Sequence, residues 1–154
     1  MKESERKILL ELLENGRNKI TDIADKFDIS RQTVSKRIEG MLEEGTIERF
    51  TLKLSDDRIG LRIKSYVFLN IVPSSELRHE FVQEAKKIKN ISQIHHMFGR
   101  FDMLLEILVK DEEELNALLD RLRDFEAVEE TETLICKYTE KNNPQDPYRV
   151  ALSE

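Results

Sequence analysis

The chain has 154 residues, of which 36% are charged and 39% are hydrophobic, and this length suits one domain or two small ones. No apolar run approaches the roughly 20 residues that a membrane-spanning helix needs, and the charged N-terminus lacks the apolar block of a signal peptide. The single cysteine, Cys136, cannot form an internal disulfide, and its apolar strand pattern predicts a buried, unreactive thiol. We therefore expect a cytoplasmic protein with no membrane partner.

The net charge of −6 argues against a protein that coats nucleic acid without regard to sequence. Residues 1–61, however, contain 12 lysines and arginines against 13 aspartates and glutamates, whereas residues 62–154 contain 13 against 18. The first part is nearly neutral and leaves room for a small basic surface. Such a surface would need duplication in a dimer to bind DNA well.

Two short helices are predicted before residue 30. Ser4 or Glu5 opens the first, which ends at residues 15–16. The second follows at once, with Asn18 or Thr21 as a possible N-cap, and breaks at residues 28–30. Their inner faces are marked by apolar residues at helical spacing, Ile8, Leu9, Leu12 and Leu13 in the first and Ile20, Ile23, Ala24 and Phe27 in the second.

A third helix is predicted between Ile29 and Gly45, with Ser30 as its N-cap and Gly45 at its end. Val34, Ile38, Met41 and Leu42 should face a core, and no carboxylate precedes Glu39. Its first two turns therefore offer donors and positive charge at the end that carries the positive helix dipole. The candidate DNA-binding residues are Ser30, Arg31, Gln32, Thr33, Ser35, Lys36 and Arg37.

The tight turn between the second and third helices predicts a helix-turn-helix, in which the second helix of the pair enters the major groove. We expect double-stranded DNA as the partner and a pseudo-palindromic operator. Two alternatives stay open, namely an ordinary helix with a solvated polar face and a helix-turn-helix that makes only protein contacts.

The chain changes period after the third helix. Residues 46–54 alternate as an extended segment, and residues 55–60 form a turn-rich hinge. We expect a DNA-binding domain over 1–50, a linker over 51–61, a second domain over 62–140 and a C-terminal tail over 141–154. The tail could be disordered or clasp a neighbouring subunit.

The second domain reads as strand, helix, strand, strand, helix, strand. This βαββαβ order predicts a ferredoxin-like antiparallel sheet with both helices on one face, so the whole chain is of the α+β class. Asp111 and Glu114 should form a capping box for the second of these helices. The predicted strands span 66–72, 94–98, 103–109 and 131–138, and the helices are 76–89 and one that carries Leu115, Leu118, Leu119 and Leu122.

The strands at 66–72 and 103–109 are apolar on nearly both faces. With no third layer in the chain, another copy of the protein is the simplest cover for the second face, which predicts a homodimer. We expect Leu69 and Ile107 to lie at that interface.

The whole chain resembles the Lrp/AsnC, or feast/famine, family of transcriptional regulators over roughly residues 3–140. The order and spacing of several weak motifs carry the resemblance. They are Arg6-Lys7-Ile8-Leu9, Ile23-Ala24, Ile29-Ser30, Arg37-Ile38, Glu43-Glu44-Gly45-Thr46-Ile47, Ile59-Gly60-Leu61, Gly99-Arg100-Phe101-Asp102, Asp111-Glu112-Glu113-Glu114-Leu115, and Val128 ahead of Thr131 and Thr133.

The resemblance implies a winged or extended helix-turn-helix domain and a ferredoxin-like effector and oligomerisation domain that assembles dimers into larger homo-oligomers. It also implies amino-acid sensing near the turn at 99–102. Gly99 would let backbone amides meet a carboxylate, helped by Arg100, and Asp102 would meet an ammonium group. Thr131 and Thr133 are weaker candidates. Without the family, this turn would read as an ordinary hairpin.

The enzyme alternative is a siroheme decarboxylase-like subunit on the same two-domain plan, which His95, His96 and Arg100 would serve. Adjacent strand residues point to opposite faces, so His95 and His96 cannot hold one metal ion together. We therefore expect a regulator rather than an enzyme, with no metal and no cofactor.

Overall fold

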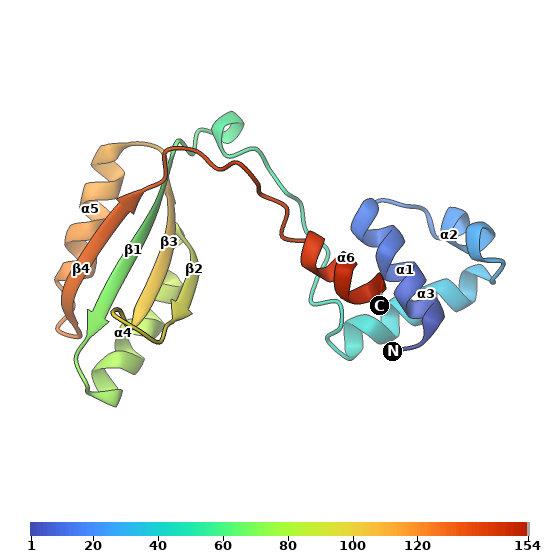
Figure 1. Ribbon diagram of the computed structural model, residues 1–154, viewed down its shortest axis with the longest axis horizontal. Coiled ribbons are helices and arrows are strands. Elements are labelled where there is room, and N and C mark those ends of the chain that lie inside the picture. Colours follow the sequence, from blue (N-terminus) through green and yellow to red (C-terminus); the bar gives the residue numbers. More distant parts are fainter. Residues whose placement is uncertain (154) are drawn as a thin grey trace. The chain divides into compact units, whose positions relative to one another are not determined.

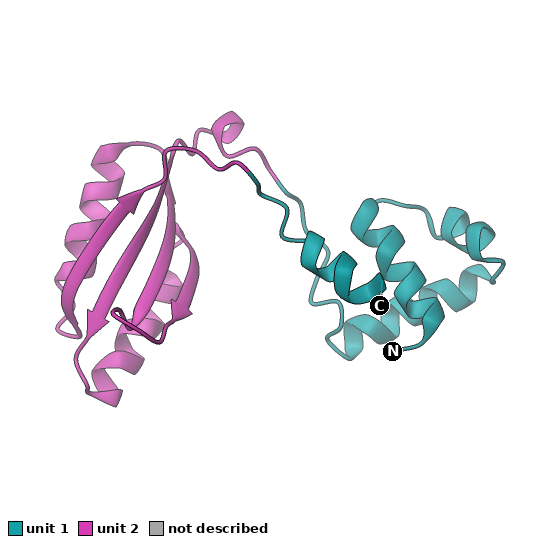
Figure 2. Ribbon diagram, viewed as in Figure 1, with its two compact units in different colours: residues 1–53, 141–154 teal, residues 54–140 magenta. Residues whose placement is uncertain are grey.

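The computed structural model describes residues 1–153. The chain divides into two compact units, one made of residues 1–53 together with 141–154 and the other of residues 54–140 (Figure 2). Each unit has its own cluster of buried hydrophobic side chains.

The first unit contains the three predicted N-terminal helices, α1 (Glu3–Glu14), α2 (Ile20–Phe27) and α3 (Arg31–Glu43) (Figure 1). Helix α1 begins slightly earlier than predicted, after Lys2. Two residues predicted to face inward, Ile20 and Leu42, are each 39% exposed. The core of the unit is formed by Ile8, Ile23, Ala24, Val34 and Met41.

The prediction of an N-cap for α2 was wrong. Lys19 takes the N-cap position, and its side chain makes no capping bond. The Asn18 amide instead donates to the Glu11 carbonyl, 3.1 Å away, and the Thr21 hydroxyl donates to Asp22. The end of α2 follows the prediction, because Asp28 adopts a left-handed conformation with φ of 52°, which short polar side chains tolerate. This residue makes the tight turn of the helix-turn-helix.

The segment after α3 does not form a strand in the described part of the chain. The alternating apolar residues Phe50, Leu52 and Leu54 are all exposed. A short 3₁₀ helix at Asp57–Ile59 follows, and Gly60 ends it with φ of 86°.

The C-terminal tail contains an additional helix, α6 (Asp146–Ser153), which lies against α1 in the first unit (Figure 1). Arg6 near the start of α1 donates to the Leu152 carbonyl at 2.7 Å, and Arg149 near the start of α6 donates to the Leu13 carbonyl at 2.7 Å. The two helices are therefore antiparallel, and each provides an arginine for a carbonyl near the end of the other. The sequence left the place of this tail undecided.

The second unit has the predicted βαββαβ order and the α+β ferredoxin-like architecture. Its four strands form one antiparallel sheet in the order β2-β3-β1-β4. The elements are β1 (Ile63–Ile71), α4 (Ser75–Lys87), β2 (Ile91–His96), β3 (Met103–Val109), α5 (Glu112–Arg123) and β4 (Val128–Ile135).

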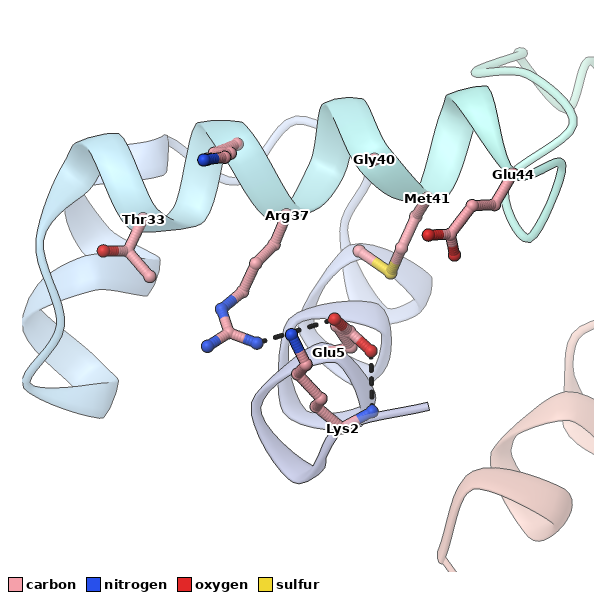
Figure 3. Close-up of a pocket in the computed structure, with 8 residues that line it drawn as sticks. Lys2, Glu5, Thr33, Arg37, Gly40, Met41 and Glu44 are labelled. Carbon is pink, nitrogen blue, oxygen red and sulfur yellow. Dashed lines mark hydrogen bonds and ion pairs between the residues drawn. The ribbon is translucent and has the colours of Figure 1, made fainter.

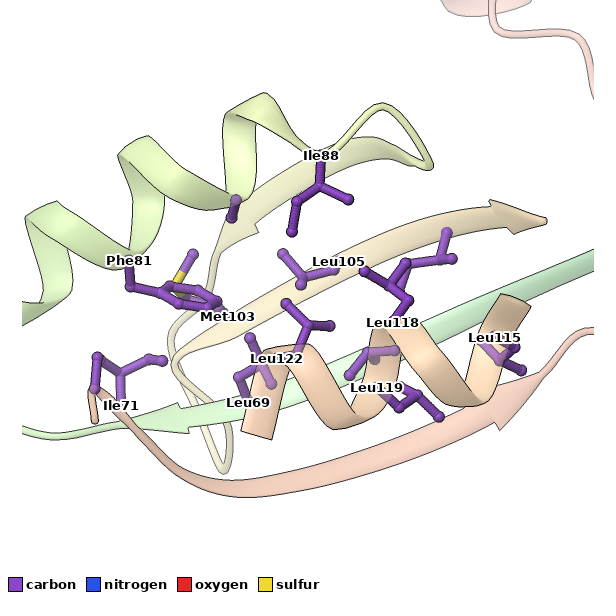
Figure 4. Close-up of a cluster of buried hydrophobic side chains, with 14 of the residues drawn as sticks. Leu69, Ile71, Phe81, Ile88, Met103, Leu105, Leu115, Leu118, Leu119 and Leu122 are labelled. Atoms are coloured by element: carbon purple, nitrogen blue, oxygen red, sulfur yellow. The ribbon is translucent and has the colours of Figure 1, made fainter. Parts of the chain in front are cut away.

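Helices α4 and α5 cover one face of this sheet, and the core lies between them and the strands. Phe81 of α4 and Leu122 of α5 meet Leu69 and Leu105 of the sheet, all almost completely buried (Figure 4). Strand residues alternate between faces, so Leu69 and Ile107 belong to this core. Our placement of these two residues at a dimer interface was wrong.

The opposite face, which we call the open face, carries alternate residues of the two central strands, namely Lys64, Tyr66, Phe68 and Asn70 of β1 and Leu104, Glu106 and Leu108 of β3. These residues are half-buried. Neither α4 nor α5 covers them, because both helices pack on the other face of the sheet. Tyr66, Phe68, Leu104 and Leu108 give that face an apolar patch, beside which Lys64 lies 4.0 Å from Glu106.

Two local predictions need correction. Asp111 accepts from the Glu114 backbone amide at 2.9 Å as expected, but the Glu114 carboxylate accepts from the amide of Lys110 rather than from that of Asp111. Cys136 is half-buried rather than buried, and its thiol lies 3.3 Å from the Tyr138 carbonyl.

Candidate DNA-binding surface and effector turn

Helix α3 begins as the sequence predicted. The Ser30 hydroxyl oxygen accepts from the Thr33 amide at 3.1 Å and lies 2.8 Å from the Thr33 hydroxyl. These two hydroxyls therefore serve the helix start first. Arg31, Gln32 and Lys36 are exposed, and Ser35 is half-buried.

Arg31 and Lys36 of α3 differ from Lys7 and Lys26 of the first unit in their partners. Lys7 pairs with Glu3 at 2.6 Å and Lys26 with Glu11 at 2.5 Å. Among the residues that the structure describes, Arg31 and Lys36 have no ion pair, and no acidic residue lies in the first turn of α3. The start of this helix thus keeps its positive charge available for an anionic partner.

Arg37 lies on the flank of α3, where the helical spacing places it. Its guanidinium points towards α1, where Nη1 lies 3.6 Å from Glu5 Oε1 (Figure 3). Only 25% of its side chain is exposed. Arg37 therefore packs between α1 and α3.

The turn between β2 and β3 closes through a hydrogen bond from the Met97 amide to the Asp102 carbonyl, 2.8 Å long. Gly99 has φ of 140°, a conformation that favours glycine, so the turn depends on this residue. Phe98, beside it, is fully exposed. Residues 98–100 are exposed at this turn.

Asp102 already has partners within the second unit. Its Oδ2 accepts from the Ile71 amide at 2.9 Å, at the end of β1, and its Oδ1 lies 3.8 Å from Arg78 of α4. The carboxylate thus ties the turn to its neighbours, while its side chain remains 40% exposed. Sequence reasoning missed Arg78, because helix and turn meet only in the folded unit.

Arg100 also has partners, all towards the open face. Its guanidinium lies 4.8 Å from the centroid of the Phe101 ring and 3.4 Å from Glu132. Phe101 packs on Phe68 with 5.2 Å between ring centroids. Glu132 was not predicted as a site residue, since only the pairing of Phe68 with Glu132 across β1 and β4 brings it near the turn.

Thr131 and Thr133 do not join Arg100. They pair with Leu69 and Val67, whose side chains face the helices, whereas Glu132 between them faces the other way. The Thr131 hydroxyl accepts from Arg123 of α5 at 3.4 Å. The Thr133 hydroxyl is buried without a hydrogen-bond partner in the described chain. The predicted effector residues are thus split between the two faces of the sheet.

The histidines likewise lie apart. His95 pairs with Leu104 on the open face, where its Nε2 lies 2.8 Å from Gln93, and His96 pairs with Met103 on the helix side. Within residues 1–153, no group of three or more histidine, cysteine, aspartate or glutamate side chains could hold a metal ion. None of the helices in that range is long and apolar enough to cross a membrane.

The fold defines a protein with a helix-turn-helix unit and a ferredoxin-like unit. Comparison with known families agrees with both parts. Residues 1–48 match the winged helix-turn-helix DNA-binding model, and residues 66–146 match the Lrp/AsnC ligand binding domain. The chain belongs to the Lrp/AsnC family of transcriptional regulators.

Two curated relatives illustrate the match. An uncharacterised HTH-type transcriptional regulator of Pyrococcus horikoshii is 31% identical over 139 residues, which cover 89% of this chain and 93% of the relative. The transcriptional regulator AzlB of Bacillus subtilis is 25% identical over 147 residues, with 94% of each chain covered. Nothing found in the comparisons supports the siroheme decarboxylase alternative.

Two solved structures share the fold. An AsnC family regulator from Agrobacterium tumefaciens aligns with a TM-score of 0.86 at 23% identity, over 96% of this chain and 99% of its own. A transcriptional regulator from Neisseria meningitidis, solved as a complex with L-Met, aligns with a TM-score of 0.87 at 19% identity over the same shares.

Proposed function

We propose that this regulator acts in the cytoplasm, reads an operator through α3 and responds to an amino-acid-like effector at the turn over residues 97–102. The observation that carries the DNA-binding half is the start of α3, where exposed Arg31 and Lys36 have no ion pair in the described chain. DNA binding is assigned to residues 1–50, and effector binding and dimerisation to residues 62–140.

The residues of α3 have different roles in this proposal. Arg31 and Gln32 can each make two hydrogen bonds to a base edge, guanine for arginine and adenine for glutamine. Lys36, with its long flexible side chain, suits a phosphate. Ser30, Thr33 and Ser35 are shorter polar contacts, and Arg37 acts from its place beside α1.

Operator binding is tested by selecting bound fragments from genomic DNA and measuring affinities for the selected duplex. Gln32→Ala should relax base preference at one position by about 1–3 kcal/mol. Lys36→Ala should weaken all sequences alike and flatten the salt dependence. Lys26→Ala, a lysine already paired with Glu11, is the matched control and should change neither. If the unmodified protein selected no fragment, the DNA-binding proposal would be wrong.

The effector half of the proposal rests on the exposed turn at Gly99 and the half-exposed Asp102 carboxylate. In the proposal an effector ammonium meets Asp102, while its carboxylate meets backbone amides of the turn or Arg100. Arg100 would then exchange part of its contact with Glu132 for the ligand. The L-Met complex of the Neisseria regulator supports an amino acid as the ligand class. Thr131 and Thr133 contribute through the helix side of β4.

A thermal-shift screen with the common amino acids tests this site. An effector at about one hundred times its dissociation constant should stabilise the protein by about 2.7 kcal/mol. The diagnostic variant is Asp102→Asn, because the asparagine oxygen can still accept from the Ile71 amide while the charge is lost. It should abolish the shift without weakening ligand-free DNA binding. An equal shift in Asp102→Asn would move the site elsewhere, and no shift with any amino acid would contradict an effector of this class.

We also propose that the open face is covered by the same face of a second copy, giving a homodimer that can build larger homo-oligomers. A two-fold dimer presents two α3 helices, so the operator should be pseudo-palindromic with half-sites one helical turn apart or a multiple of it.

We infer that the protein is a regulator without catalytic activity, since the relatives above are named as transcriptional regulators. Purification from a host that makes siroheme should yield protein without a bound tetrapyrrole. A stoichiometric tetrapyrrole in the purified protein would favour the enzyme alternative instead.

A further inference from the structure

A cavity of about 350 Å³ lies between the start of α1 and the side of α3 (Figure 3). Three cationic residues, Lys2, Lys36 and Arg37, line it together with Glu5, Glu44 and Thr33. It is separate from the outer face of α3 to which base reading has been assigned, although Thr33 and Lys36 belong to the same two turns of the helix.

The two carboxylates of the cavity are not equivalent. Glu5 Oε2 accepts from the Lys2 backbone amide at 2.6 Å, which occupies it at the start of α1. Glu44 follows the last turn of α3, at the opposite end from Thr33 (Figure 3). The side chains of Lys2 and Lys36 have no ion pair among the described residues, so the end of the cavity near Thr33 and Arg37 carries an excess of positive charge.

The guanidinium of Arg37 lacks an acceptor. Its Nε and Nη1 atoms are buried and have no hydrogen-bond partner in the described chain, because Glu5 Oε1, at 3.6 Å from Nη1, is too far away for a hydrogen bond. Leaving charged donors buried without acceptors is unfavourable. An anion that enters the adjacent cavity can supply an acceptor after a small side-chain movement, so this site favours an anionic occupant.

We propose that the cavity binds one backbone phosphate of the operator, with Lys2 and Lys36 as direct contacts and Arg37 behind them. The proposal rests on the proposed DNA-binding function of α3. When the start of α3 lies in the major groove, the phosphates of a flanking strand run beside the helix, and Lys36 stands between the base-reading residues and this cavity. The start of α1 thereby becomes part of the DNA interface and fixes the register of α3 without reading sequence.

The experiment compares Lys2→Ala with Lys7→Ala, in protein without an N-terminal tag. Both lysines belong to the start of α1, but Lys7 already pairs with Glu3. Affinity for a selected duplex is measured over a series of salt concentrations. Lys2→Ala should reduce the slope of log K against log salt by about 0.9, the value for one lost phosphate contact, and should weaken selected and unrelated duplexes by the same factor. Lys7→Ala should match the unmodified protein.

Ethylation interference on the operator locates the contact. The unmodified protein and Lys7→Ala should share one phosphate whose ethylation blocks binding, and Lys2→Ala should lose sensitivity there alone. Arg37→Ala should lose the same phosphate and flatten the slope, provided that circular dichroism shows it folded. Should Arg37→Ala not fold, the comparison of Lys2→Ala with Lys7→Ala decides the question alone.

The outcomes separate this inference from the function on which it rests. If the unmodified protein selects no duplex, DNA binding itself is wrong. If it binds DNA but Lys2→Ala and Lys7→Ala give equal slopes and equal interference patterns, only the phosphate site is wrong. The cavity could also bind a free phosphate ion instead of a DNA phosphate. A titration with inorganic phosphate, followed by NMR through the Arg37 Nε–H resonance, tests this alternative. Saturable shifts in that titration together with equal slopes would identify a site for free anions and overturn the assignment to DNA.

Discussion

Ser30 shows how one side chain sets the start of the candidate recognition helix. Its hydroxyl oxygen accepts from the Thr33 amide, one of the donors that the helix cannot satisfy internally. Ser30→Ala should therefore destabilise the first unit by about 1 kcal/mol, as N-cap substitutions commonly do. Urea denaturation followed by circular dichroism would measure the change. Ser35→Ala, in the interior of the same helix, is the control and should be close to neutral.

Tyr66 gives a prediction for alkaline pH. Burial raises the pKa of its phenol above the ordinary value, and the nearby Glu106 carboxylate raises it further. A raised pKa in the folded state means that the folded protein holds the proton more tightly than the unfolded chain. This contribution to stability is therefore complete below the ordinary tyrosine pKa of about 10 and is lost as pH rises through the folded value.

The measurement is the difference in tyrosinate absorbance between the unmodified protein and Tyr66→Phe during an alkaline titration. The difference should appear above pH of about 10. Tyr66→Phe should also lose less stability over that range. Titration of Tyr66 at or below the ordinary value would show that the open face is more polar around this residue than its surroundings indicate.

At the scale of elements, α6 is the clearest addition that the tertiary structure makes. Arg149 donates to the Leu13 carbonyl and pairs with Glu14 at 2.7 Å, and Tyr148 and Leu152 line an apolar cavity with Leu13 and Leu9. Arg149→Ala should loosen α6 by about 1–2 kcal/mol, chiefly through the lost charged hydrogen bond, because Glu14 is 72% exposed and its ion pair is screened by solvent.

Hydrogen exchange of the α6 amides measures this local stability. Arg121→Ala, an exposed arginine on α5 without an ion pair in the described chain, is the control and should leave α6 protected. If α6 amides exchanged in the unmodified protein as fast as those of residues 141–145, the helix would not be anchored as described.

The elements also show where sequence reasoning succeeds. Periodicity placed α3, α5 and β3 closely, because each has a long regular pattern and a clear cap or turn at its ends. It failed at the start of α2, where Lys19 has no capping side chain to mark the boundary. It also predicted an extended segment at residues 46–54, and there the alternating apolar residues find no strand partner in the described chain.

For the whole molecule, Phe68 and Leu69 make a matched pair that tests the proposed dimer. They are adjacent in β1 but face opposite sides of the sheet, with Leu69 completely buried against the helices. Leu69→Asp should unfold the second unit, since it places an unpaired charge in the core. Phe68→Asp should leave the fold intact and convert the dimer to a monomer.

Light scattering and circular dichroism distinguish these outcomes. The unmodified protein should remain a dimer at low micromolar concentration, and folded Phe68→Asp should have half its mass and bind the pseudo-palindromic operator more weakly. A folded monomer in the unmodified chain would remove the dimer proposal, and a folded dimer of Phe68→Asp would place the interface on another surface.

The sequence by itself determined the order of helices and strands from α1 to β4, the cap of α3 and the carboxylate-free start of that helix, but not α6. These features depend on residues a few positions apart, so period and capping chemistry are sufficient to predict them. The sequence also showed that the central strands are apolar on both faces. It did not show which of the two faces packs against the helices. That assignment depends on the face that α4 and α5 cover, which only packing decides.

Tertiary structure alone decided the partners that charged groups find far away in the sequence. Arg37 meets Glu5 across two helices, Asp102 accepts from Ile71, and Arg100 pairs with Glu132 through the register of β1 and β4. Arg6 finds the Leu152 carbonyl 146 positions away. A cation on a helix can turn to solvent, to a neighbouring helix or to DNA with no change in the local pattern. Its role is fixed only when distant segments bring, or fail to bring, an acceptor to it.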